Sequence, residues 1–214
     1  MIWLARHGET TWNVEGRYQG RLESPLSELG MRQAAALALH FSAVLARSET
    51  VPARVVSSPL GRCVETARPS AEALGVPLET DARLIEIAHG TWEGRYRDEL
   101  AANDPERYRT WRTDPAHVSF DGGETVRDVL ERWRSFAAEL ALRDEPALVV
   151  THDAVVRCAL VDLEDRSLDD FWNVRVENGA YALLARRAGR FEIVEQCVHA
   201  HLAGLRAPIG GQAL

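Results

Sequence analysis

The sequence predicts an α/β fold: a three-layer sandwich in which helices flank a mostly parallel central sheet. Short apolar runs alternate with helix-like segments along the chain. This alternation requires crossover connections, which are right-handed and place helices on both faces of a parallel sheet. The 214 residues, 46% of them apolar, suffice for one sizeable core. We therefore expect a single domain over residues 1–214.

The strands are predicted from short apolar runs bounded by turn or cap residues. In chain order, the predicted strands cover residues 2–5, 54–57, 147–151, 181–185 and 191–197. The first and third of these are apolar throughout or nearly so, which is typical of strands buried on both faces. Gly189 marks a turn between the last two runs, so we expect these to be joined directly.

The helices are predicted from apolar residues at helical spacing. In chain order, they cover residues 27–47, 60–74 (ending at Gly75), 124–142 and a segment from about 154. Ser27 is a good N-cap for the first helix, although Gly30 stands where a capping box would have Glu. Thr125 and Asp128 form a capping pair for the third helix.

Two segments depart from this regular pattern. Residues 84–123 are rich in Arg, Trp and Tyr and carry the turn signals Asp104-Pro105, Asp114-Pro115 and Gly122-Gly123. We interpret this segment as an insertion that arches over one end of the sheet near the active site. Residues 203–214 contain Pro208, Gly210 and Gly211, which predicts a loose tail.

Composition excludes several classes of function. The net charge is −7, which disfavours non-specific binding to nucleic acid or to an anionic membrane. All 25 basic residues are Arg, which excludes a P-loop lysine and lysine Schiff-base chemistry. The three cysteines lie far apart, and His199 and His201 lack an evident third ligand, so we expect no disulfide framework and no metal site. With no signal peptide and no stretch long enough to span a bilayer, we expect a cytoplasmic protein.

Histidine and arginine residues directly follow three predicted strands. Arg6 and His7 follow the first, Arg62 comes shortly after the second, and His152 follows the third. Ligands of such folds bind beyond the carboxyl ends of the strands, so we expect these side chains to converge. Arginine forks match phosphate oxygens, and a neutral imidazole is a competent nucleophile toward phosphorus. The sequence therefore predicts a site for phosphoryl transfer.

With these residues in place, the sequence resembles the histidine phosphatase superfamily, which has the phosphoglycerate mutase-like fold. The matching motifs appear in family order over nearly the whole chain: residues 4–10 (LARHGET), Asn13, 19–20 (QG), 25–30 (PLSELG), Gln33, 57–67 (SSPLGRCVETA), Glu86, 90–94 (GTWEG), 122–124 (GGE) and 149–152 (VVTH). A lone RHG tripeptide would be weak evidence, but this ordered set is very specific.

The resemblance implies roles for individual residues. His7 is the expected nucleophile that becomes phosphohistidine, and Glu86 is the expected proton donor. The remaining phosphate-binding residues that it implies are Arg6, Asn13, Arg62 and His152. We add, as substrate-binding candidates near the pocket, Gln19, Gly20, Arg21, His89, Trp92 and Asp153. Ser58 is expected to help orient His7.

The sequence departs from the family pattern at two places. Many relatives have Gly after the second histidine, where this chain has Asp153. Cofactor-dependent phosphoglycerate mutases usually follow the catalytic Glu with Arg-His-Tyr-Gly, whereas here Glu86 is followed by residues 87–90, Ile-Ala-His-Gly. Trp92 and the two residues after it resemble the phosphatase branches, including broad-specificity and α-ribazole phosphatases. Asp153 leaves the chemistry intact, whereas residues 87–90 and the phosphatase-like residues 92–94 favour water over a second phosphate acceptor.

We therefore expect a metal-independent phosphomonoesterase that needs no cofactor and hydrolyses a small phosphorylated metabolite. A bisphosphoglycerate-dependent phosphoglycerate mutase is the alternative, and a non-catalytic phosphate-binding module is a weaker one. We expect no nucleic-acid or membrane partner, and we leave a homodimer open. The sequence does not identify the physiological substrate.

Overall fold

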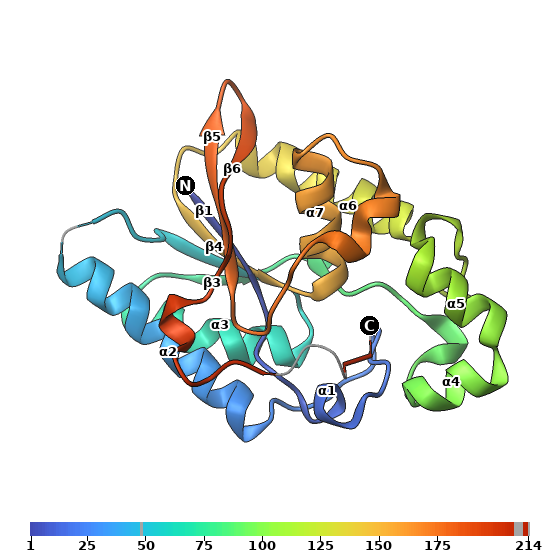
Figure 1. Cartoon of the computed structure of the whole chain (residues 1–214). Helices are drawn as coiled ribbons and strands as arrows, with labels where there is room; N and C mark the ends of the chain where they lie inside the picture. Colours follow the sequence, from blue (N-terminus) through green and yellow to red (C-terminus); the bar gives the residue numbers. More distant parts are fainter. Residues whose placement is uncertain (48, 208–211, 214) are drawn as a thin grey trace.

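The computed structural model describes residues 1–47, 49–207 and 212–213, and its centre is a mixed sheet (Figure 1). The strands are β1 (Ile2–Arg6), β2 (Arg54–Ser57), β3 (Leu78–Thr80), β4 (Ala147–Thr151), β5 (Tyr181–Arg187) and β6 (Arg190–Val198). They lie in the order β3-β2-β4-β1-β5-β6. The pairs β3-β2, β2-β4 and β4-β1 are parallel, and β5 and β6 add an antiparallel edge. The predicted mostly parallel sheet is confirmed.

Helices cover both faces of the sheet. The helices are α1 (Thr11–Glu15), α2 (Glu28–Ala46), α3 (Gly61–Leu74), α4 (Arg97–Asn103), α5 (Pro105–Thr113), α6 (Val126–Ala141) and α7 (Asp153–Leu163). Successive strand residues point to opposite faces. Ile2 and Leu4 therefore join the core formed with α6 and α7, whereas Trp3 and Ala5 join the core formed with α2 and α3. These three layers are the predicted sandwich.

The main helix boundaries follow from the predicted caps. The Ser27 hydroxyl accepts the backbone N–H of Gly30, and Thr125 forms a reciprocal capping box with Asp128. Gly30 stands in place of a Glu because a neighbouring chain segment passes against it. A Cβ at this position would lie 1.9 Å from the carbonyl oxygen of Glu9. That contact holds the segment after β1 against the start of α2.

The helix α2 is long and apolar enough to resemble a membrane-spanning helix. By length and composition alone, with a mean hydropathy of 1.2, it could cross a membrane, so the expectation of no such stretch is wrong for this helix. In the fold, Leu37 and Phe41 of α2 are fully buried, and Phe41 packs edge-on against Trp3 of β1. One apolar face of α2 thus packs against the sheet, whereas Met31, Leu39 and Leu45 of the same helix are exposed.

The insertion and the tail are more ordered than the sequence indicates. Within residues 84–123, α4 and α5 are helices that the sequence analysis did not predict, with Pro105 at the start of α5. Of the predicted loose tail, residues 208–211 and 214 lie outside the described residues. Gln212 and Ala213 are buried at 7% and 2% exposure, and the looseness of the tail stays a prediction. The N-terminus lies at the opposite end of β1 from Arg6, whereas the C-terminal residues lie near α1 (Figure 1).

Candidate active site

The two predicted histidines meet because β1 and β4 are parallel neighbours. Arg6 pairs with Thr151 in register, and the backbone N–H of His7 donates to the Thr151 carbonyl at 2.9 Å. His7 and His152 therefore leave the sheet side by side, with their ring centroids 5.2 Å apart. Both rings are buried. The convergence expected from the strand ends is present.

The imidazole of His7 is held with one nitrogen anchored. Its Nδ1 lies 2.7 Å from the carbonyl oxygen of its neighbour Gly8. A carbonyl can only accept, so Nδ1 carries the proton and Nε2 keeps its lone pair. Burial, and then the charges of Arg62 and Arg6, lower the pKa of His7 well below its usual value. The ring is therefore neutral, with Nε2 available as a nucleophile.

Gly8 is required for this arrangement by close backbone packing. A Cβ on Gly8 would lie 2.6 Å from the carbonyl oxygen of Gly30, at the start of α2. The backbone N–H of Gly8 also donates to Thr66 Oγ1 of α3 at 2.9 Å. The segment after His7 is thereby fixed against both α2 and α3, which explains why glycine follows His7.

Two buried arginines lie beside the histidines. Arg6 and Arg62 are each 1% exposed. Arg62 donates from its Nη atoms to the carbonyls of Gly20, at 2.7 Å, and Leu22, at 2.9 Å. Among the residues that the structure describes, the Nε atoms of both arginines and Nδ2 of Asn13 have no hydrogen-bond partner. Buried donors without partners are costly, and an anion with several oxygens would satisfy them together.

Glu86 places a carboxyl group in the same buried region. It is 5% exposed, and its Oε1 accepts the backbone N–H of Ile87 at 2.9 Å. Burial raises the pKa of Glu86 to about 7; Arg62 and Arg6 oppose this rise and Asp153 adds to it. A carboxyl with this pKa is protonated in a substantial fraction of molecules near neutral pH. It can therefore act as a general acid.

Ser58 contacts His152 rather than His7. Its Oγ lies 2.8 Å from Nε2 of His152, and Cys63 Sγ lies 3.4 Å from the same nitrogen. The expectation that Ser58 orients His7 is therefore wrong, because β2 lies next to β4 and not next to β1. Burial, and then Arg62, lower the pKa of His152 well below its usual value. The imidazole of His152 is therefore neutral, like that of His7.

Two further residues at the site were missed by the sequence analysis. Asn178 Nδ2 donates to the carbonyl of His7 at 3.2 Å, and Asn178 Oδ1 accepts from Gln212 Nε2 at 2.8 Å. Gln212 Oε1 in turn accepts from Arg6 Nη2 at 2.8 Å. Asn178-Gly179 precedes β5, the other neighbour of β1, so extending the strand-end argument to β5 would have found it. Gln212 carries no sequence signal.

The substrate-binding candidates occupy different surroundings. Gln19 is buried and accepts from the Thr10 hydroxyl at 3.0 Å, and the carbonyl of Gly20 holds Arg62. The side chain of Arg21 is 43% exposed and pairs with Glu124 at 2.8 Å. Asp153 is fully buried and pairs with Arg6.

His89 and Trp92 lie inside an aromatic cluster built largely by the insertion. We define this aromatic cluster as Tyr18, His89, Trp92, Trp111 and Phe120. All of its members are at most 3% exposed. Tyr18, Trp92, Trp111 and Phe120 belong to the same core as the buried residues of α6 and α7, so the cluster joins the insertion to that core. Substrate contact by His89 or Trp92 stays a prediction.

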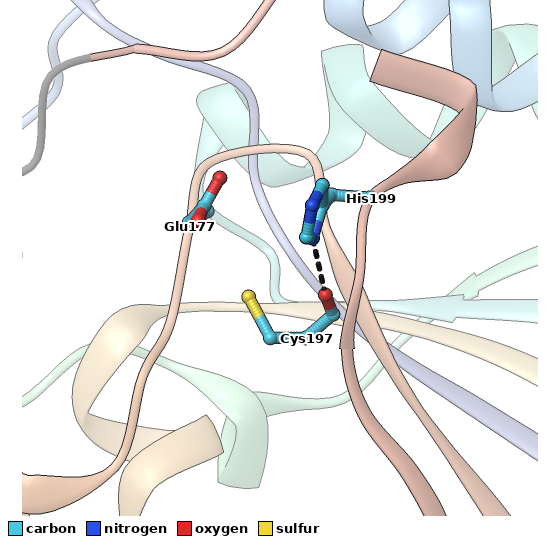
Figure 2. A group of neighbouring side chains, drawn as sticks. All are labelled: Glu177, Cys197 and His199. Carbon is cyan, nitrogen blue, oxygen red and sulfur yellow. Dashed lines mark hydrogen bonds between the residues drawn. The ribbon is translucent and has the colours of Figure 1, made fainter. Parts of the chain in front are cut away.

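Outside the pocket, Glu177, Cys197 and His199 bring potential metal ligands together (Figure 2). One ligand atom from each lies within 4.8 Å of the others. The sequence analysis set His199 aside for want of further ligands, which the fold supplies from β6 and the loop before β5. However, the Glu177 carboxylate already accepts from Arg175 and Arg206. A cation here would face two guanidinium groups, so the electrostatics oppose a metal ion.

Comparison with known proteins agrees with this geometry. The family model of the histidine phosphatase superfamily (branch 1) matches residues 2–198. The chain is 35% identical over 204 residues to phosphoserine phosphatase 1 of Hydrogenobacter thermophilus, covering 93% of this chain and 92% of that protein. It is 33% identical over 165 residues to a probable phosphoglycerate mutase, GpmB, of Yersinia pestis, covering 76% of this chain and 74% of the relative.

A solved structure extends the likeness to the fold. The structure of Bacillus stearothermophilus YhfR superposes with a TM-score of 0.87 at 30% identity, covering 94% of this chain and 98% of that one. The match therefore spans the sheet, both helical layers and the insertion. Taken with the family match over residues 2–198, it shows that the chain belongs to branch 1 of the histidine phosphatase superfamily and is a phosphatase.

Proposed function

We propose that this phosphatase hydrolyses a small phosphorylated metabolite in two in-line transfers, from the substrate to His7 and then from His7 to water. The observation that carries the proposal is the state of His7. Its Nδ1 proton is tied to the Gly8 carbonyl, its Nε2 lone pair is free, and the unpartnered Nε donors of two buried arginines lie in the same site. Phosphoryl transfer needs mainly such positioning and charge stabilisation.

In the first transfer, Nε2 of His7 forms a bond to phosphorus as the bond to the ester oxygen breaks. The leaving oxygen takes the proton of Glu86, whose raised pKa keeps that proton available near neutral pH. Arg6 and Arg62 donate to the equatorial oxygens. The arriving negative charge also favours the protonated form of His152, which then adds a donor.

In the second transfer, water replaces the leaving group. The Glu86 carboxylate takes a proton from this water as its oxygen bonds to phosphorus, and the bond to Nε2 breaks. Inorganic phosphate leaves, and His7 and Glu86 return to their starting states. In this scheme the charge of the transferred group is balanced by side chains alone, so no metal ion or cofactor is needed.

The direct test is to trap the phosphoenzyme. Mixing the enzyme with a ³²P-labelled phosphomonoester and quenching should leave label that is stable to alkali and labile to acid, the behaviour of phosphohistidine. Peptide mapping should place it on His7, and hydrolysis should survive EDTA. Label on another residue, or none during rapid turnover, would contradict the proposal. A panel of phosphorylated metabolites that includes phosphoserine, ranked by kcat/KM, would then identify the substrate class.

The phosphoglycerate mutase alternative is supported by the likeness to a probable mutase and opposed by residues 87–90. Incubation with 3-phosphoglycerate and bisphosphoglycerate separates the two activities. A phosphatase releases mainly inorganic phosphate, whereas a mutase produces 2-phosphoglycerate. Cytoplasmic localisation and a homodimer stay predictions.

A further inference from the structure

Asp153 is a fully buried carboxylate in a pocket built to hold an anion. It directly follows His152 and is the first residue of α7. Its Oδ2 lies 3.0 Å from Nη1 of Arg6, and both side chains are at most 1% exposed. A buried charge is costly unless it is paired in good geometry. Asp153 therefore carries a buried charge that needs a partner, and Arg6 supplies one as an ion pair.

A second arginine fixes the carboxylate from the other side. Arg157, one turn further along α7, donates from Nε to Asp153 Oδ1. Arg157 itself donates to the carbonyls of Val174 and Phe171, and its guanidinium lies 5.0 Å from the ring centroid of Trp172. The carboxylate is thus anchored to the fold before it meets Arg6. Because the carboxylate is anchored, it can hold the Arg6 guanidinium in one position.

We propose that Asp153 is a positioning residue for the phosphate pocket: it holds the guanidinium of Arg6 in place and balances the positive charge that surrounds Glu86. Arg6 forms an ion pair with Asp153 through Nη1 and donates from Nη2 to Gln212. Among the described residues neither its Nε nor its Nη1 has a hydrogen-bond partner, so both can donate to a phosphate oxygen. This inference rests on the proposed function, because it assigns Arg6 to the phosphate and Glu86 to the leaving group.

The effect on Glu86 follows from the charges around it. The titratable groups that interact with Glu86 are Arg6 on β1, Arg62 and Cys63 on α3, and Asp153 and Cys158 on α7. The two pocket histidines, His7 and His152, lie beside the same two arginines. Both histidines are neutral, and burial raises the pKa of both thiols above the neutral range. The charge balance at Glu86 is therefore set by two guanidinium groups against one carboxylate.

Removing the Asp153 carboxylate should lower the pKa of Glu86. Without the charge of Asp153, Arg6 and Arg62 act unopposed on Glu86 and stabilise its ionised form. The pKa of Glu86 then falls, and the acid form needed for leaving-group protonation is lost at a lower pH. The alkaline limb of the kcat/KM profile should move to lower pH, by about one pH unit for one nearby charge. A role confined to holding the fold together would not move this limb.

The experiment compares Asp153→Asn with Asp162→Asn. Asp162 lies on the same helix but pairs with the exposed Arg134, away from the pocket. For Asp153→Asn we expect the alkaline limb of the kcat/KM profile to shift to lower pH. We also expect kcat/KM at the optimum to fall by about 10- to 100-fold, because the guanidinium of Arg6 is no longer held in position by an ion pair. For Asp162→Asn we expect the wild-type profile. Circular dichroism and thermal unfolding check that each variant is folded.

Glycine at position 153, the residue of many relatives, supplies a second variant that also lacks the charge. If Asp153→Asn does not fold, Asp153→Gly should show the same shift. A folded variant of either kind whose alkaline limb coincides with that of the wild type would overturn the inference. This outcome differs from failure of the proposed function, in which the wild-type enzyme itself would give no phosphohistidine on His7.

Discussion

Two buried histidines of this protein, His7 and His89, differ in what surrounds them. Their side chains are 2% and 1% exposed, and burial lowers the pKa of both. His7 has one nitrogen bound to the Gly8 carbonyl and lies beside two arginines. In the part of the chain that the structure describes, neither ring nitrogen of His89 has a hydrogen-bond partner, and its neighbours are aromatic.

The difference shows which feature marks a nucleophile. Loss of charge accompanies any buried imidazole, so a lowered pKa does not separate the two residues. A fixed tautomer does, because it determines which nitrogen holds the lone pair. Neighbouring cationic donors without partners also separate the two residues, because such donors can bind the phosphoryl group that a nucleophile attacks. By both criteria the surroundings of His7 fit the proposed nucleophile, whereas the surroundings of His89 fit packing within the insertion.

The largest expected effect is on the nucleophile. His7→Ala should lower kcat by at least about 1,000-fold, because a positioned nucleophile contributes on this scale or above it. His89→Leu, which keeps the aromatic cluster packed, should retain kcat within about threefold. Steady-state kinetics on one phosphomonoester measure both. Equal losses in two folded variants would erase the distinction drawn between these histidines.

The next effect separates the proton donor from the nucleophile. Glu86→Gln should reduce hydrolysis of an alkyl phosphate by about 10²- to 10⁴-fold, the usual contribution of a general acid. An aryl phosphate with an electron-poor leaving group needs little protonation, so its hydrolysis should fall far less. Comparing kcat/KM for the two esters is the measurement. A uniform loss on both would assign Glu86 to binding instead.

The pH dependence follows from the same carboxyl. Burial raises the pKa of Glu86 to about 7, so kcat/KM for an alkyl phosphate should decline as the pH rises through about 7. The Glu86→Gln variant, with no titrating group at this position, should lack that decline. A wild-type profile that stays level from pH 6 to 9 would exclude Glu86 as the acid.

The smallest effect concerns stability. The pKa of His89 is about 3 in the folded state and about 6.5 when unfolded, so the unfolded chain binds the extra proton between these values. This residue therefore makes the protein less stable as the pH falls from about 6.5 toward 3. In His89→Leu the free energy of unfolding should fall less steeply with acid, by up to about 1.4 kcal/mol per pH unit. Urea denaturation at several pH values tests this, and parallel curves would contradict it.

The sequence was sufficient to predict that Arg6, His7 and His152 lie together, because the ends of strands can be recognised from local sequence. Apolar runs locate β1, β2 and β4, and topology then brings Arg6, His7 and His152 together. The motif resemblance added Glu86, which occupies an irregular loop and would otherwise pass for a surface carboxylate. The structure buries it and raises its pKa to about 7.

What the sequence did not predict depends on tertiary contacts. The helices α4 and α5 are short and polar, and each contributes one buried residue, Leu100 or Trp111, to a core assembled from elsewhere. The partner of Ser58 depends on strand order, which a linear pattern does not state. Gln212 reaches Arg6 across 206 positions of the chain, a contact that no local pattern can indicate.

The direction of β1 has a practical consequence for handling the enzyme. The chain contains no lysine, so no side chain of residues 1–214 carries a primary amine, and amine coupling would use the α-amino group of Met1. Partial burial and Arg186 lower the pKa of that group, which increases its reactive free-base fraction near neutral pH. Amine coupling through Met1 to a resin or sensor surface would attach the protein by one end of the sheet, with the candidate phosphate pocket at the other end turned outward to the solution.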